Sequence, residues 1–210
     1  MIVAIDGPAG AGKSTVARRL AERLGFRYLD TGAMYRALTW LAIREEIPLD
    51  RGRRLGELAR DNPVGLGEDG RVTIAGQDVT DAIRHSRIDR LVPVVARHND
   101  VREVMRERQR DLADLGNAVI EGRDIGTVVA PDADVKIYLN ADRGVREQRR
   151  LAERPDIGPD ALATDLRMRD ESDKARMQPA PDAEQIDTTE LDVEDVVAHI
   201  EELVRAQTRA

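Results

Sequence analysis

The amino-terminal segment constrains the fold most, because it joins a short apolar run to a glycine-rich motif. Residues 2–6 (Ile-Val-Ala-Ile-Asp) are largely apolar and β-branched, which predicts a buried strand. Residues 7–14 (Gly-Pro-Ala-Gly-Ala-Gly-Lys-Ser) match the pattern G-x-x-x-x-G-K-[ST], and residues 14–24 carry apolar side chains at helical spacing. A strand, a glycine loop and a helix in this order predict a nucleoside triphosphate site.

The chemistry of this loop, called here the phosphate loop (residues 7–14), follows from its residue types. Glycines let successive backbone N–H groups turn toward a phosphate, and the helix that follows adds positive potential. Lys13 is expected to reach the β- and γ-phosphates, and the Ser14 hydroxyl to bind Mg²⁺. A glycine-rich turn with an incidental lysine would not need the flanking strand and helix. The expected ATP-binding residues are Gly7, Pro8, Ala9, Gly10, Ala11, Gly12, Lys13, Ser14 and Thr15.

Composition excludes several other classes of function. The chain has no cysteine and three scattered histidines, so thiolate chemistry, disulfides and structural zinc are excluded. Its formal net charge is −7, which argues against a long nucleic-acid footprint. No apolar run approaches the roughly 20 residues that span a bilayer, and residues 1–5 are too short for a secretory signal. We therefore expect a cytoplasmic protein that binds neither nucleic acid nor membrane.

The rest of the chain alternates between strand and helix patterns. This alternation predicts an α/β fold with a parallel sheet covered by helices on both faces. Further strands are expected at 26–29, 118–120, 135–139 and 185–186, and further helices at 33–44, 101–115, 143–153 and 193–205.

Two stretches depart from this alternation. Residues 62–83 contain several glycines and a period-two run at 71–74, which predicts a small antiparallel insert with a turn at 68–70. Residues 146–176 read as two polar, arginine-rich helices separated by residues 155–159. Both stretches are candidate moving parts.

The sequence also limits what is done with the triphosphate. It lacks the Asn-Lys-x-Asp guanine reader of a GTPase, and no apolar strand ends in the Asp-Glu pair of RecA-like motors. Arg36 and Arg123 instead follow two of the expected strands. Because ligands bind beyond the carboxyl ends of parallel strands, Arg123 and Asp124 are expected to face the phosphate loop.

Arginines at these places favour an anionic acceptor. A phosphate monoester is repelled by the ATP phosphates, and guanidinium groups, with forked donors and permanent charge, offset that repulsion. The sequence therefore favours phosphoryl transfer from ATP to a nucleoside monophosphate, although each arginine alone suits a surface salt bridge equally well.

A third cluster lies on the second arginine-rich helix. Arg169, Asp173 and Arg176 are spaced i, i+4 and i+7, which places them on one helix face. They could grip a phosphate and a ribose. An exposed ion pair worth about 0.3–0.5 kcal/mol is the simpler interpretation, and spacing alone favours it.

Taken together, six segments of the chain resemble the bacterial cytidylate kinases, within the nucleoside monophosphate kinases. The resemblance runs essentially from end to end. The segments that carry it are residues 5–14, 28–36, 78–84, 121–133, 169–176 and 186–189.

The resemblance implies a core with five parallel strands (1–35, 115–142 and 178–210), a nucleoside-monophosphate-binding part with the β insert (36–114) and a short lid (143–177). It implies a monomer in pyrimidine nucleotide metabolism that transfers the γ-phosphoryl group of Mg²⁺-bound ATP to CMP or dCMP.

It also implies a set of acceptor-binding residues. Thr31 and Arg36 would hold the nucleotide, with Arg36 and Arg123 on its phosphate. Asp124 and Arg102 would contact the cytosine edge. For the third cluster the resemblance favours the gripping role, with Arg169 and Asp173 on the ribose and Arg176 on the phosphate.

Catalysis would rest on Lys13, Arg123 and an arginine of the lid. By resemblance, the lid arginines that close over the transferring group come from Arg146, Arg149, Arg150 and Arg154, and we take Arg149 as the catalytic one.

The sequence departs from the family pattern in places. Pro93 stands where a base-contacting serine is common, which predicts weaker discrimination of cytosine from uracil or more reliance on Asp124. Ser172 and Ala175 replace residues that are often Arg and Asn. Two alternatives stay open: a small kinase for shikimate or another nucleotide, and a nucleotide-dependent switch without transferase activity.

Overall fold

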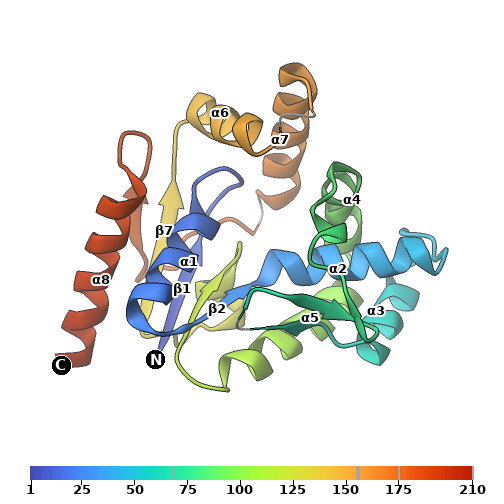
Figure 1. The fold of residues 1–210 in the computed structure, drawn as a ribbon, viewed down its shortest axis with the longest axis horizontal. Coiled ribbons are helices and arrows are strands. Elements are labelled where there is room, and N and C mark those ends of the chain that lie inside the picture. Colours follow the sequence, from blue (N-terminus) through green and yellow to red (C-terminus); the bar gives the residue numbers. More distant parts are fainter. Residues whose placement is uncertain (68, 155–156, 175, 210) are drawn as a thin grey trace. The chain divides into compact units, whose positions relative to one another are not determined.

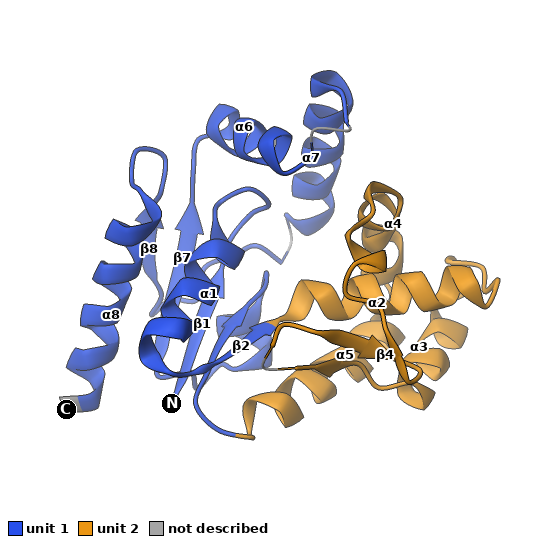
Figure 2. Cartoon of the chain, in the orientation of Figure 1, with its two compact units in different colours: residues 1–29, 116–210 blue, residues 30–115 orange. Residues whose placement is uncertain are grey.

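A computed structural model of the chain describes residues 1–67, 69–154, 157–174 and 176–209 (Figure 1). The chain divides into two compact units, coloured separately in Figure 2. Unit 1 comprises residues 1–29 and 116–210, and unit 2 comprises residues 30–115.

Unit 1 is built on the predicted five-stranded sheet. Its strands, β1 (Ile2–Asp6), β2 (Arg27–Asp30), β6 (Ala118–Glu121), β7 (Val135–Asn140) and β8 (Glu184–Asp187), lie in the order β2-β6-β1-β7-β8. β1 is central and pairs in parallel with β6 and β7, and β7 pairs in parallel with β8. The register places Ile5 opposite Glu121, so β6 ends beside the start of the phosphate loop.

Two helices cover one face of this sheet. α1 (Lys13–Leu24) and α8 (Val193–Arg209) pack against each other, and both contribute to one buried cluster with the strands. Val3, Ile137 and Leu139 supply the sheet side of this cluster, and Val197 and Ile200 supply part of the α8 side. The apolar stripe predicted at 193–205 is therefore the face that α8 buries.

The two arginine-rich helices are present after β7. α6 spans Arg143–Glu153 and α7 spans Pro159–Asp173, while Pro155 and Asp156 between them lie outside the described residues. The spacing argument that put Arg176 on the same helix was wrong, because α7 ends at Asp173. Arg176 is held next to the helix end, where its backbone N–H donates to the Asp173 carbonyl at 2.7 Å.

Unit 2 contains helices and a small sheet. Its elements are α2 (Thr31–Arg44), α3 (Gly52–Asp61), β3 (Gly65–Leu66), β4 (Val72–Ile74), β5 (Gln77–Asp78), the 3₁₀ turn η1 (Ala82–Arg84), α4 (Ser86–Ala96) and α5 (Asn99–Ala113). The three strands pair antiparallel in the order β3-β4-β5, which confirms the predicted insert. Glu68 of the predicted turn lies outside the described residues.

Within unit 2, α3 packs against α5, and α2 packs against α4 and β4. α2 begins where the Asp30 carboxylate accepts a hydrogen bond from the Ala33 N–H at 2.8 Å, a standard N-terminal cap. α3 and α4 were not predicted from the sequence. Among the described residues, no helix is long and apolar enough to cross a membrane.

Candidate active site

The phosphate loop leaves β1 in a space that excludes side chains. Gly7 has φ +145°, and a Cβ at this position would lie 2.0 Å from the Leu139 carbonyl oxygen of β7. A glycine is therefore required for the loop to begin beside the neighbouring strand.

Three successive carbonyls of the loop each accept a hydrogen bond from a different cation. Arg123 Nη1 donates to Gly7 O at 2.6 Å, Lys13 Nζ to Pro8 O at 2.8 Å and Arg146 Nη1 to Ala9 O at 3.1 Å. The loop is therefore bordered by three basic side chains. Desolvation and then the Arg123 guanidinium lower the pKa of Lys13 to about 7.

Ser14 lies at the head of a short chain of hydrogen bonds. Its Oγ donates to Glu121 Oε2 at 2.9 Å, and the Tyr28 hydroxyl donates to the other oxygen of the same carboxylate. Glu121 is buried at the end of β6, with 4% of its surface exposed. The Arg18 guanidinium lies 5.4 Å from the centre of the Tyr28 ring.

This donor set fits a magnesium ion that is held chiefly by phosphate. Ser14 and Glu121 offer oxygen atoms, which Mg²⁺ prefers. Among the described residues, no group of three or more acidic, histidine or cysteine side chains could hold a metal ion. Because Mg²⁺ usually keeps several waters and binds one or two protein oxygens with the substrate phosphates, a sparse site is the expected one.

Sequence reasoning missed Glu121, although a signal for it was present. The Asp-Glu pattern of RecA-like motors does not find it, because β6 ends in a single acid followed by glycine. An acidic residue that ends an apolar strand next to β1 would have been the better criterion.

Asp6, at the end of β1, is a second residue that sequence reasoning missed. It is 5% exposed, and its two carboxylate oxygens accept hydrogen bonds from the Ile125 and Gly126 N–H groups, both at 2.8 Å. Burial raises the pKa of the Asp6 carboxyl, the two N–H groups oppose that rise, and Asp124 adds to it. These bonds fix the start of η2 (Ile125–Val129), a π-helical turn that Asp124 immediately precedes.

Arg123 connects the loop to α7. Its Nη1 binds Gly7 O, as described above, and its Nε lies 3.1 Å from Asp173 Oδ2. Asp173 also lies 3.9 Å from Arg176, whose guanidinium donates to the Ser172 carbonyl at 2.9 Å. The structure therefore brings Arg123, Asp173 and Arg176 together, and both arginines that pair with Asp173 lie outside α7.

Arg149 of α6 is held by Thr188. Its guanidinium donates to Thr188 Oγ1 at 2.9 Å and to Thr188 O at 2.6 Å, and Thr188 Oγ1 in turn lies 3.2 Å from Ala11 O. A Cβ at Gly12 would lie 3.9 Å from Arg149 Nη1. Arg149 is therefore next to the loop. Arg150, by contrast, pairs with Glu153 on its own helix at 2.6 Å.

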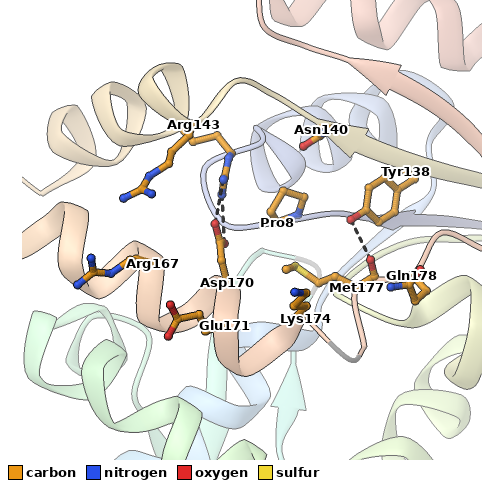
Figure 3. A pocket seen from close by; sticks show the side chains of 11 residues that line it. Pro8, Tyr138, Asn140, Arg143, Arg167, Asp170, Glu171, Lys174, Met177 and Gln178 are labelled. Atoms are coloured by element: carbon orange, nitrogen blue, oxygen red, sulfur yellow. Dashed lines mark hydrogen bonds and ion pairs between the residues drawn. The ribbon is translucent and has the colours of Figure 1, made fainter.

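A cavity of about 390 Å³ lies beside the loop in unit 1 (Figure 3). Pro8 and Asn140 border it on the side of the sheet, and Arg143, Arg167 and Lys174 border it from α6 and the α7 region. Arg146 and Asp170 also line it and form an ion pair, drawn as dashed lines that reach Asp170 in Figure 3.

The sequence matches the family model described as "Cytidylate kinase" over residues 3–206. The chain belongs to the cytidylate kinase family. It is 45% identical to a cytidylate kinase of Shouchella clausii over 99% of this chain and 97% of that protein. It is also 42% identical to that of Bacillus subtilis, over 99% of this chain and 97% of the relative.

Solved structures agree on the fold. A shikimate kinase from Bacteroides thetaiotaomicron superposes with a TM-score of 0.52 at 19% identity, covering 98% of each chain. A gluconokinase from Sinorhizobium meliloti gives a TM-score of 0.52 at 15% identity, covering 99% of this chain and 93% of that one. At such identities the similarity concerns the fold alone, and it confirms the predicted phosphate-loop architecture.

The residues that family resemblance selects for the acceptor divide between the two units. Asp124, Arg169 and the cluster around Arg123 belong to unit 1, whereas Thr31, Arg36 and Arg102 belong to unit 2. Asp124 is 9% exposed and Arg169 is half-buried on α7.

In unit 2, Thr31 is the buried first residue of α2, and Arg36 Nη2 lies 2.7 Å from Asp30 Oδ2. Arg102 is half-buried on α5. Pro93 is half-buried inside α4, so the departure from the family pattern sits within a helix.

Proposed function

We propose that the chain transfers the γ-phosphoryl group of ATP to CMP, giving CDP and ADP, and that dCMP is a second acceptor. The observation that carries this proposal is the double engagement of Arg123. Its guanidinium binds the Gly7 carbonyl of the phosphate loop and the Asp173 carboxylate of α7 at once. The phosphate loop and the helix that bears the proposed acceptor residues Arg169 and Asp173 thus meet at one arginine, in a chain of the cytidylate kinase family.

The reaction needs charge neutralisation more than acid–base chemistry. An oxygen of the CMP phosphate forms the new bond to the γ-phosphorus, and the bond from that phosphorus to the oxygen bridging to the β-phosphate breaks. Both reactants are anions, so the barrier includes their repulsion. Lys13, Arg123 and Arg149 surround the loop and would offset this charge as it redistributes in the transition state.

The Ser14 hydroxyl, with Glu121 behind it, would hold Mg²⁺ on the ATP phosphates. The ion would supply further neutralisation of phosphate charge. Tyr28 donates to the same carboxylate and thereby fixes its orientation toward Ser14.

Acceptor recognition would use the residues that the family resemblance selects. We assign Asp124 and Arg102 to the cytosine edge, where a carboxylate accepts from the exocyclic amino group and opposes the carbonyl of uracil. Arg169 and Asp173 would bind the ribose. The phosphate of CMP would be held by Arg36, Arg123 and Arg176, with Thr31 nearby on the nucleotide.

We further assign residues 36–114 to acceptor binding and residues 143–177 to a lid, which would exclude water from the transferring group. Water is the competing acceptor in any such site.

An acceptor panel tests the proposal. Purified protein with Mg²⁺-ATP is assayed for ADP release with CMP, dCMP, UMP, AMP, shikimate or no acceptor. We expect CMP to give the highest kcat/KM, dCMP to follow, and the reaction without acceptor to be slow. Equal ADP release with and without CMP would instead indicate a nucleotide hydrolase or switch, and a higher kcat/KM for shikimate would indicate a different kinase.

A further inference from the structure

Arg146 differs from the other arginines of α6 in its burial. It is 8% exposed, and its main chain packs directly on the phosphate loop. A Cβ at Gly10 would lie 2.8 Å from the Arg146 carbonyl oxygen and 2.9 Å from the Arg146 Cβ. Gly10 has φ +78°, so this position both needs the left-handed conformation and touches α6.

The guanidinium of Arg146 joins three segments of unit 1. Nη1 donates to Ala9 O at 3.1 Å, and Nη1 and Nη2 form a forked pair with Asp170 Oδ1 and Oδ2 at 3.1 and 2.8 Å (Figure 3). Such bidentate pairs fix orientation as well as charge. The phosphate loop, α6 and α7 therefore converge on one side chain.

The hydrogen bond from Arg146 to the Ala9 carbonyl determines the direction of the Gly10 N–H group. The described peptide bonds are trans, and in a trans peptide the C=O and the following N–H point in opposite directions. By holding the Ala9 carbonyl toward α6, Arg146 aims the Gly10 N–H away from α6. Phosphate loops bind their ligand through such N–H groups.

The ion pair between Arg146 and Asp170 connects the Ala9–Gly10 peptide to α7, the helix that carries the proposed ribose-binding residues. Asp173 follows one turn later on α7 and pairs with Arg123, which binds Gly7 O. α7 is thus tied to the loop at Gly7 through Asp173 and Arg123, and at Ala9 through Asp170 and Arg146. In the described part of the chain, Arg146 Nε is buried without a hydrogen-bond partner, a cost that indicates that the side chain is held where its two other nitrogens are needed.

We propose that Arg146 is a positioning residue that orients the Ala9–Gly10 peptide for ATP and, through Asp170, couples ATP binding to acceptor binding on α7. This inference rests on the proposed function, because it takes α7 to be part of the acceptor site. It gives Arg146 a role away from the transferring group, which the resemblance had left open among four lid arginines.

The test measures binding of a non-hydrolysable Mg²⁺-ATP analogue and of CMP by calorimetry, each alone and each with the other saturating. In the natural protein we expect each ligand to tighten the other by at least about fivefold. Arg146→Met should lower the affinity for the analogue by about tenfold or more and change the affinity for CMP, measured without the analogue, by less than about threefold. In this variant neither ligand should change the affinity for the other.

Two further variants separate the two bonds. Asp170→Asn keeps the Ala9 bond, so the analogue should bind within about threefold of the natural affinity while the mutual tightening is lost. Arg146→Lys keeps one charge without the fork and should recover part of the analogue affinity. Arg205→Met is the matched control, because Arg205 is an exposed arginine of α8 that does not line the cavity and pairs with Glu201 of its own helix at 2.7 Å; it should leave all four affinities unchanged.

The outcomes are distinct. Analogue affinity and mutual tightening that survive in Arg146→Met would overturn the proposal. If that variant does not fold, as judged by circular dichroism, unchanged tightening in Asp170→Asn would overturn the coupling role. Failure of the natural protein to phosphorylate CMP would reject the proposed function, while the analogue affinities of the Arg146 variants would still decide whether Arg146 positions the loop.

Discussion

Lys13 is half-buried beside the Arg123 guanidinium, and both conditions disfavour its charged form. Its pKa of about 7 in the ligand-free protein lies well below the ordinary lysine value. Bound triphosphate would bring several negative charges to the ammonium and raise that pKa again. Nucleotide binding should therefore be linked to proton uptake.

We predict that the protein takes up roughly one proton when it binds the Mg²⁺-ATP analogue at pH 8, where Lys13 is mostly neutral in the free protein. At pH 6 binding should be accompanied by little proton uptake. Calorimetry in two buffers of different ionisation enthalpy measures this uptake directly. Lys13→Met is the control, since it should remove the buffer dependence. A heat at pH 8 that does not depend on the buffer would contradict the assignment.

The same shift affects stability, with a definite sign. The pKa of Lys13 is lower in the folded than in the unfolded chain, so the unfolded chain binds more protons above pH 7. The Lys13 contribution to the free energy of unfolding therefore rises with pH from about 7 to about 10.4.

Asp124 is the residue on which base choice would depend most. Pro93 offers no hydroxyl in α4, so the buried Asp124 carboxylate, which directly precedes η2, would carry more of the discrimination between cytosine and uracil. We predict that Asp124→Ala lowers the ratio of kcat/KM for CMP to that for UMP by about tenfold or more. The exposed Asp132→Ala serves as control, and an unchanged ratio in Asp124→Ala would reject the role.

At this scale the sequence predicted Lys13, Ser14 and Arg123 because a motif or a strand end marks each of them. It did not predict Glu121 or Asp6. Their importance depends on which strand lies beside β1, and that order is a property of the sheet rather than of any local pattern.

Among the elements, the junction of β1 with the phosphate loop is the most constrained. Gly7 and Gly25 both have positive φ, but a Cβ at Gly7 would meet the Leu139 carbonyl, whereas a Cβ at Gly25 would meet nothing within 4 Å. Alanine at Gly25 therefore introduces only backbone strain, whereas alanine at Gly7 also introduces a clash with the Leu139 carbonyl.

We predict that Gly25→Ala costs about 1 kcal/mol of unfolding free energy, from the left-handed backbone alone. Gly7→Ala should cost more, about 3 kcal/mol, because strain and overlap with β7 add. Urea denaturation measures both values. Equal costs would show that the loop can move away from β7.

The elements that the sequence failed to predict have physical reasons. α4 contains Pro93, which cannot donate to the Asp89 carbonyl four residues earlier and normally argues against a helix interior. α3 contains Gly52 and Gly56, where helix propensity is poor, and it is stabilised by packing on α5. The π-helical turn η2 depends on two hydrogen bonds to Asp6, a residue far away in the sequence.

For the whole molecule, the division into two units matters most, because the proposed acceptor residues come from both. The α/β class and the antiparallel insert could be predicted from periodicity. Residues 62–83 and 146–176 could be named as candidate moving parts, but how each unit responds to ligands could not be predicted, because no local pattern encodes that response.

We predict that a bisubstrate analogue, with ATP and CMP moieties joined, slows hydrogen exchange across residues 146–176. The reason is that both ligand halves would contact groups on or next to α6 and α7. Hydrogen-exchange mass spectrometry gives the readout, with α8 as an internal reference expected to change little. Exchange in 146–176 that ignores the analogue would contradict the lid assignment.

The most direct test of the account follows the fate of one phosphorus atom. The protein is incubated with Mg²⁺-ATP labelled at the γ-phosphate and with unlabelled CMP, and the products are separated. We predict that the label appears as the β-phosphate of CDP, and that Lys13→Met or Arg123→Met greatly slows its appearance. Label that stays in ATP, or that is released as inorganic phosphate whether or not CMP is present, would contradict the claim that this site joins two phosphates.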